Sequence, residues 1–365
     1  GNLSSARYEN GFAERRLPDA VGNLFKSRDR KDRKYGPAGQ LLEATDKQGT
    51  TYYEYDAEGN LIKKVQPGGK VWHYQWNDTG MLTKVVRPDK EAVTFVYDPL
   101  GRRIKKSYRG RTTHWIWDGN NPLHEWTEKE KEQTDSDPEI TGSLEKAPEI
   151  ADKKRKRLLR AKISSSAPPP PPIAGTLDDP ITWLFEPETF TQAVKIVGKT
   201  HYAIVTDHLG TPTLMIDEQG ETVWTADISI YGKLRNQGLN QQKQACPFRW
   251  PGQYEDQETG LYYNRFRYYD PDAGQYVSQD PIGLKGGLRK FSYVHNPTCW
   301  IDPYGLKSCK FSDEVIKNLG EPPPGMVRPH KHHIVMEGDF SHWKPENKRY
   351  VEDARQILKD HDIDI

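Results

Sequence analysis

A chain of 365 residues is too long for one ordinary domain and predicts two or more structural units. The net charge of +1 gives no overall field that favours nucleic acid or a membrane surface, and no apolar run of about eighteen residues predicts a transmembrane segment. The three cysteines, Cys246, Cys299 and Cys309, lack metal-ligand spacing and do not make a disulfide scaffold, so we interpret them as ordinary thiols.

Residues 1–127 contain a repeat. Phrases such as YDAEGNLIKK and YDPLGRRIKK place glycines at intervals of 20 or 21 residues, at Gly39, Gly59, Gly80 and Gly101. Alternating residues, an Asp- or Asn-containing turn and a glycine suited to positive φ predict a β-hairpin. One hairpin cannot bury a face alone, so we expect the hairpins to join into an extended sheet.

Residues 128–180 interrupt the repeat with a charged, proline-rich stretch that includes five consecutive prolines, Pro168 to Pro172. Consecutive prolines adopt polyproline II and cannot join a sheet, so we predict a disordered insertion in the surface of the sheet. The run KKRKRLLR is typical of nucleic-acid or sorting patches, but a solvated linker is the simpler interpretation.

Residues 181–306 return to strand patterning, with six aromatic residues between Tyr262 and Tyr276 that indicate sheet faces. The pentapeptide Asp-Pro-x-Gly-Leu occurs at Asp280 and again at Asp302. Two neighbouring carboxyl groups do not both ionise readily, so one keeps a proton while the other can activate water, as in aspartic proteases. Asp-Pro-x-Gly is also an ordinary turn sequence, and spacing alone leaves both interpretations open.

These phrases together resemble the Rhs family with its YD repeats. TDHLGTP resembles a recurrent phrase of its shell, and ETGLYYNRFRYYDPDAGQYVSQDPIGLKGG resembles its C-terminal core motif most specifically. The resemblance covers residues of about 35–127 and 181–306. It implies a mainly β fold in which hairpins form part of a hollow shell, or β-cocoon, whose last motif cuts the chain behind it. It further implies that Asp280 and Asp302 are catalytic, with Arg267 as their basic partner. Cleavage would fall between Leu306 and Lys307 and need no cofactor.

Residues 307–365 differ in composition and hold five of the eleven histidines. Val351, Ala354, Ile357 and Leu358 fall on one face of a predicted helix, so we expect a separate, small α+β unit. Adjacent histidines can supply a metal ligand and a neighbouring base.

The phrase HHIV, followed by ARQIL and IDI, resembles the AHH/HNH-type toxin nucleases. The resemblance implies a divalent metal (Mg or Zn) held by His332, with His333 as general base and DNA as the substrate. Lys331 stands where the family expects Ala, and the family pattern continues beyond Ile365. We therefore expect this nuclease segment to be incomplete, and the start without Met predicts a missing N-terminal part.

The two resemblances imply a secreted antibacterial Rhs toxin that carries and releases its own C-terminal toxin. A type VI-like system would deliver it into target bacterial cells, in line with the absence of a signal peptide and a membrane segment. A cognate immunity protein would mask the tail, and the missing N-terminal part would bind the secretion spike and chaperone. One alternative is a non-catalytic YD-repeat shell or adhesive protein. Another is a cleaved Rhs toxin whose tail has a non-nuclease activity.

Overall fold

The computed structural model describes residues 3–9, 11–129, 175–237, 246–306 and 309–310. These residues form an almost entirely β structure, with one short 3-10 helix, η1 (Gly283–Gly286). The predicted mainly β fold is confirmed. The α+β unit expected from residue 307 onward lies outside the described residues, apart from strand β26 (Cys309–Lys310). Within the described ranges, no helix is long and apolar enough to cross a membrane.

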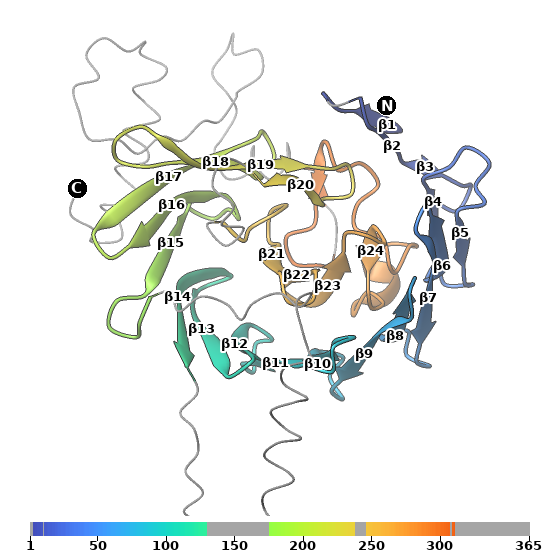
Figure 1. Cartoon of the computed structure of the whole chain (residues 1–365), viewed down its shortest axis with the longest axis horizontal. Coiled ribbons are helices and arrows are strands. Elements are labelled where there is room, and N and C mark those ends of the chain that lie inside the picture. The colour runs from blue at the N-terminus through green and yellow to red at the C-terminus, as the bar shows by residue number, and fades with distance from the viewer. Residues whose placement is uncertain (1–2, 10, 130–174, 238–245, 307–308, 311–365) are drawn as a thin grey trace, which may run out of the picture.

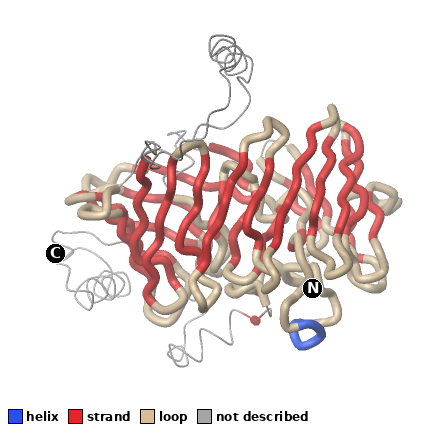
Figure 2. The backbone as a smooth tube through the Cα atoms, turned by 90° about the horizontal axis from the view of Figure 1, so that it is seen from below, coloured by secondary structure: helices blue, strands red, loops and turns tan. Residues whose placement is uncertain are grey.

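Sixteen strands form one sheet in which sequence neighbours pair antiparallel from β5 to β20. Figure 2 shows these strands side by side, and Figure 1 shows that the sheet curves into an arc. The strands are β5 (Arg33–Tyr35), β6 (Leu41–Asp46), β7 (Gly49–Tyr55), β8 (Leu61–Gln66), β9 (Lys70–Trp76), β10 (Leu82–Val86), β11 (Ala92–Tyr97), β12 (Arg103–Tyr108), β13 (Arg111–Asp118), β14 (Asn121–Lys129), β15 (Ile181–Phe185), β16 (Gln192–Val197), β17 (Thr200–Thr206), β18 (Pro212–Ile216), β19 (Thr222–Ile228) and β20 (Leu234–Gln237).

The turn between β7 and β8 shows why the repeat folds as a hairpin. The backbone N–H of Gly59 donates to the Asp56 carbonyl at 3.1 Å, and the Asp56 side chain accepts from the backbone N–H groups of Glu58 and Asn60. Gly59 has a φ of 81°, which glycine adopts without steric cost. The predicted combination of strand, Asp turn, glycine and return strand is therefore confirmed here.

The charged and proline-rich interruption joins two neighbouring strands of this sheet. Residue 129 ends β14 and residue 181 begins β15, and the two strands pair with His124 opposite Thr182. The repeat strands and the strands after the interruption thus belong to one continuous sheet.

A second sheet of four strands lies on the concave side of the arc (Figure 1). Three further pairs of short strands accompany the two sheets. The four strands are β21 (Tyr254–Asp256), β22 (Leu261–Asn264), β23 (Arg267–Asp270) and β24 (Gln275–Tyr276). The short pairs are β1 (Ser5–Arg7) with β2 (Ala13–Arg15), β3 (Leu17–Pro18) with β4 (Leu24–Phe25), and β25 (Trp300–Ile301) with β26.

Alternating tyrosines give the small sheet two apolar faces. Tyr263 and Tyr268 pack into the core of the large sheet with residues such as Leu61 and Val93. Tyr262, Tyr269 and Tyr276 pack with Trp250 and Tyr293 on the opposite face. Side chains alternate between the faces of a strand, so the aromatic pattern places the small sheet between two cores.

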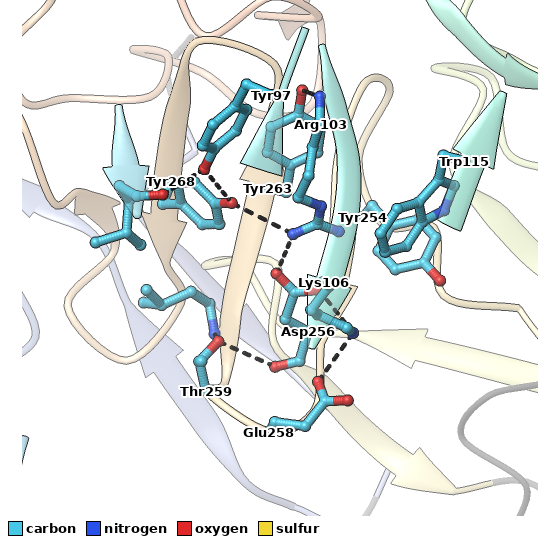
Figure 3. Close-up of polar contacts among 12 residues, drawn as sticks. Tyr97, Arg103, Lys106, Trp115, Tyr254, Asp256, Glu258, Thr259, Tyr263 and Tyr268 are labelled. Carbon is cyan, nitrogen blue, oxygen red and sulfur yellow. Dashed lines mark hydrogen bonds and ion pairs between the residues drawn. The ribbon is translucent and has the colours of Figure 1, made fainter. Parts of the chain in front are cut away.

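Buried ion pairs also join the two sheets (Figure 3). Lys106 Nζ of β12 lies 3.0 Å from both Asp256 and Glu258, and Arg103 of the same strand pairs with Asp256. A buried charge is expensive without a partner, so these cations and carboxylates favour the docked arrangement. The large sheet thereby fixes the start of the segment that leads to the candidate site.

Candidate functional site

Arg267, Asp280 and Asp302, which the sequence singled out, lie together in a buried cluster. One guanidinium nitrogen of Arg267, Nη2, lies 3.2 Å from Oδ2 of Asp280 and 3.2 Å from Oδ2 of Asp302. The side chains are only 2%, 4% and 0% exposed, respectively, so water screens these charges little. We call Asp280 and Asp302 the aspartate pair.

Both aspartates also act as turn residues, and they do so through Oδ1, the carboxylate oxygen that does not contact Arg267. Oδ1 of Asp280 accepts from the Ile282 backbone N–H at 3.0 Å, and Oδ1 of Asp302 accepts from the Leu306 backbone N–H at 2.9 Å. The turn interpretation of Asp-Pro-x-Gly is therefore correct. It does not exclude a site, because each turn leaves Oδ2 directed at Arg267.

Arg267 is held by several acceptors as well as by the aspartate pair. It starts β23, its Nε donates to the Gly305 carbonyl, and its Nη1 donates to the Lys290 carbonyl at 2.9 Å. Its guanidinium carbon also lies 3.6 Å from the ring centroid of Tyr276. Arginine suits this place because its planar fork can serve several acceptors at once. It therefore links both Asp-Pro-x-Gly-Leu segments.

The carbonyl of the predicted scissile bond lies beside Asp280. A methyl group in place of the Gly286 hydrogen would collide with both the Leu306 carbonyl oxygen and Oδ2 of Asp280. The two oxygens are therefore neighbours, with Gly286 leaving the space between them open. A carboxyl group at this place can donate a proton to that carbonyl oxygen.

The buried surroundings favour the protonated form of each member of the pair. Burial raises the pKa of Asp302, and the opposing effects of Arg267 and of the hydrogen bond from Tyr276 do not cancel it. Burial likewise raises the pKa of Asp280, and the neighbouring Asp302 carboxylate adds to the rise. One guanidinium cannot neutralise two carboxylates, so one shared proton is the favoured state of the cluster.

Two further residues, which sequence reasoning missed, contact Asp302. The Tyr276 hydroxyl donates to Oδ2 of Asp302 at 2.9 Å, and Nδ2 of Asn264 donates to the Asp302 backbone carbonyl at 2.9 Å. The aromatic alternation places Tyr276 on a sheet face but gives no sign of a carboxylate partner. Asn264 lies opposite Arg267 in the β22–β23 hairpin, which is the one local signal that could have identified it.

The residues predicted for nuclease chemistry lie outside the described residues. These are His332 and His333, and Lys307 on the far side of the proposed cut is outside them as well. In the part of the chain that the structure describes, no group of three His, Cys, Asp or Glu side chains is placed to hold a metal ion. The metal site of the tail thus stays a prediction.

Comparison with known families agrees with the hairpin architecture. The family model described as RHS Repeat matches residues 35–71 and 55–92, and the one described as RHS protein matches residues 201–238. Residues 35–92 are therefore similar to Rhs repeats. The first matches cover the hairpins from β6 to β10, and the other covers β18, β19 and β20 with most of β17.

Several curated proteins are similar over most of this chain. It is 32% identical over 305 residues to "Double-stranded DNA deaminase toxin A" of Burkholderia cenocepacia, a match that covers 79% of this chain and 19% of that protein. It is 31% identical to "Probable deoxyribonuclease RhsA" of Dickeya dadantii, covering 74% of this chain and 16% of that protein. It is also 31% identical to "Toxin protein Tse5" of Pseudomonas aeruginosa, a match that covers 74% of this chain and 20% of that protein. The chain therefore spans a fifth or less of the length of these three relatives.

Among solved structures, one match is to "TcdB2-TccC3 without hypervariable C-terminal region". The match covers 83% of this chain and 17% of that chain, with a TM-score of 0.44 and 18% sequence identity.

Proposed function

We propose that this chain is the C-terminal part of a secreted antibacterial Rhs toxin that cuts itself between Leu306 and Lys307. The observation that carries the proposal is the aspartate pair on one nitrogen of Arg267, with the Leu306 carbonyl beside Asp280. The Rhs matches and the relatives named as toxins support the wider assignment. The curved sheet would form part of the shell that encloses the tail.

The aspartate pair would work as one base and one acid. We assign the negative charge to Asp302 because Arg267, Tyr276 and the Leu306 N–H all direct donors at its oxygens. Asp280 has two donors, Arg267 and the Ile282 N–H, and would keep the proton. Hydrogen bonds to a carboxylate favour its charged form, so the better-bonded member ionises first.

The reaction consumes one water molecule. Asp302 takes a proton from the water as its oxygen attacks the Leu306 carbonyl carbon, while Asp280 gives its proton to the carbonyl oxygen. The tetrahedral intermediate then returns a hydroxyl proton to Asp280, and the carbon–nitrogen bond breaks. The Lys307 nitrogen receives the proton held by Asp302. The products are a carboxyl group on Leu306 and an amine on Lys307, and the aspartate pair returns to its starting state.

A non-catalytic shell is the rival from another class of function. Turn formation accounts for Oδ1 of each aspartate, but not for the two Oδ2 atoms that share a buried guanidinium. Burying two carboxyl groups beside one cation costs stability that a plain turn does not require. The arrangement therefore favours catalysis over a purely structural role.

Expression of the full chain tests self-cleavage directly. Wild type should yield a fragment that starts at Lys307, detected by intact mass, and Asp302→Asn and Asp280→Asn should each stay whole. A contaminating protease would cut all three chains alike. A wild-type chain that stays whole when natively folded would leave the non-catalytic shell as the better account.

We further propose that the released tail is a metal-dependent DNase, with His332 as metal ligand and His333 as general base. Relatives named as probable deoxyribonucleases in Dickeya dadantii support this activity. The alternative to a DNase is a tail with a non-nuclease activity, and the relative named as a deaminase toxin supports that alternative. A cognate immunity protein, a secretion spike and chaperone, and type VI-like delivery into target bacteria belong to the same proposal.

Plasmid degradation by the full-length toxin, with a complete tail, tests the tail activity. The proposal expects Mg²⁺-dependent loss of supercoiled DNA that His333→Ala abolishes. Equal degradation by wild type and His333→Ala would instead point to a contaminating nuclease. Absence of degradation with any divalent metal would favour the alternative tail activity.

A further inference from the structure

The hydroxyl of Tyr276 occupies a place that its packing does not require. Tyr276 is fully buried on β24 and belongs to an aromatic cluster with Tyr262 and Tyr269. Those two tyrosines donate to backbone carbonyls, Tyr262 to Gly232 at 3.0 Å and Tyr269 to Tyr231 at 2.9 Å. Tyr276 instead donates to the Oδ2 of Asp302 that Arg267 also contacts.

Asn264 fixes the direction of that hydrogen bond. Its Nδ2 lies 2.9 Å from the Asp302 backbone carbonyl and 2.7 Å from the Tyr276 hydroxyl oxygen. A carbonyl oxygen only accepts, so the amide must present its NH₂ group here, and the same group donates to the phenol. The phenol oxygen therefore accepts from Asn264, and its own proton is directed at Asp302.

The surroundings keep the phenol a donor. Burial raises the pKa of Tyr276 well above its usual range, and the Asp302 carboxylate adds to the rise. A neutral hydroxyl that donates to a carboxylate stabilises the charged form of that carboxylate. Asp280 has no such neighbour in the contacts of the described residues; its donors are Arg267 and the Ile282 N–H.

We propose that Tyr276 is a positioning residue whose hydroxyl, oriented by Asn264, makes Asp302 rather than Asp280 the ionised member of the pair. The proposal rests on self-cleavage by the aspartate pair and names the group that decides which aspartate acts as base. Tyr276 acts through Asp302 and does not itself contact the Leu306 carbonyl in the contacts described.

Tyr276→Phe is the sharpest variant, because it keeps the ring beneath the Arg267 guanidinium and removes only the hydroxyl. Tyr269→Phe is the matched control, since it removes a buried hydroxyl from the same cluster without touching the aspartate pair. Each full-length chain is kept unfolded in denaturant and then diluted into buffers across the acid and neutral range. Cleavage is followed on denaturing gels.

Tyr276→Phe should be cut about tenfold more slowly than wild type. A factor of about ten corresponds to the free energy of one hydrogen bond to a charged group. Less stabilisation of the Asp302 carboxylate should also move the acid limb of its pH–rate profile to higher pH by about one pH unit. Tyr269→Phe should keep the wild-type rate and profile. Asn264→Ala should shift the acid limb in the same direction, and the double variant with Tyr276→Phe should be no slower than Tyr276→Phe alone.

The possible failures are distinct. A wild-type rate and profile for Tyr276→Phe would overturn the positioning role and leave self-cleavage standing. A slower rate with an unmoved acid limb would make Tyr276 a packing residue only, which also overturns it. Wild type that is not cut would remove the proposed function itself. If Tyr276→Phe does not refold, the acid limb of Asn264→Ala decides the question in the same way.

Discussion

Lys64 of the large sheet lies 2.8 Å from Asp270 of the small sheet, and both side chains are buried. Burial opposes the charge on Lys64, but the Asp270 carboxylate, together with Tyr53, Tyr74 and Asp272, more than offsets it and raises the Lys64 pKa. Asp270 ends β23, the strand that Arg267 begins. The ion pair thus connects the large sheet to β23, the strand whose Arg267 contacts the aspartate pair.

Lys64→Met should therefore destabilise the docked small sheet. The substitution leaves the buried Asp270 carboxylate without its cation, which should lower the free energy of unfolding by about 3–5 kcal/mol. Lys63→Met is the control from the next position, because Lys63 makes an exposed pair with Glu54 that is worth about 1 kcal/mol or less. Urea unfolding in an uncut Asp302→Asn background measures both. Equal midpoints for the two variants would contradict a role for the buried pair in docking.

Arg267→Lys should slow self-cleavage by at least about tenfold, although it keeps the positive charge. A lysine presents a single ammonium group and cannot serve the aspartate pair and the Gly305 and Lys290 carbonyls together. Arg289→Lys is the control, since Arg289 donates to the Gly22 carbonyl at 3.2 Å and does not touch the pair. Cleavage half-times on refolding give the comparison. Unchanged cleavage in Arg267→Lys would show that charge alone suffices.

Gly286→Ala should block the cut while the shell still folds. Gly286 does not have a positive φ, so alanine meets no backbone strain, but its Cβ would collide with Asp280 Oδ2 and the Leu306 carbonyl oxygen. Gly36→Ala is the matched control: its φ is also not positive, and its Cβ would meet only the flexible end of Gln40. Gel analysis should show an intact Gly286→Ala chain and a cut Gly36→Ala chain. Equal cutting would mean that the carbonyl does not approach Asp280.

Stability should depend on pH through the aspartate pair. Each pKa is raised in the folded chain, so the folded state binds a proton more readily than the unfolded state does. Stability is then gained as pH falls through the raised pKa values towards the ordinary value of 3.8, and it is lost again as pH rises. The uncut double variant Asp280→Asn/Asp302→Asn should gain less stability on acidification than the uncut single variant Asp302→Asn, which keeps one of the two raised carboxyl groups. Thermal midpoints at neutral and mildly acidic pH measure this, and parallel curves would contradict it.

Local patterns predicted much of this molecule. The spacing of Gly59 and its equivalents predicted the hairpins, and the aromatic alternation from Tyr262 to Tyr276 predicted the two faces of the small sheet. The repeated Asp-Pro-x-Gly-Leu, together with the Rhs resemblance, singled out Asp280, Asp302 and Arg267, which the structure brings together.

The remaining contacts depend on how distant segments dock. Lys64 and Asp270 are 206 positions apart, and no spacing rule pairs them. Asn264 and Tyr276 meet Asp302 only because the chain returns after β24 and lays residues 302–306 against β22 and β23. A turn aspartate and a catalytic aspartate also look the same in sequence, because one carboxylate can supply both roles with different oxygens.

Refolding of the full-length chain in water labelled with the heavy oxygen isotope tests the central claim most directly. Hydrolysis by the aspartate pair predicts that the N-terminal fragment ends at Leu306 and carries one heavy oxygen in its new carboxyl group, while the fragment that starts at Lys307 carries none. Asp302→Asn under the same conditions should stay whole. A wild-type chain cut at another bond, a fragment without the label, or equal cutting of Asp302→Asn would contradict self-cleavage at this site.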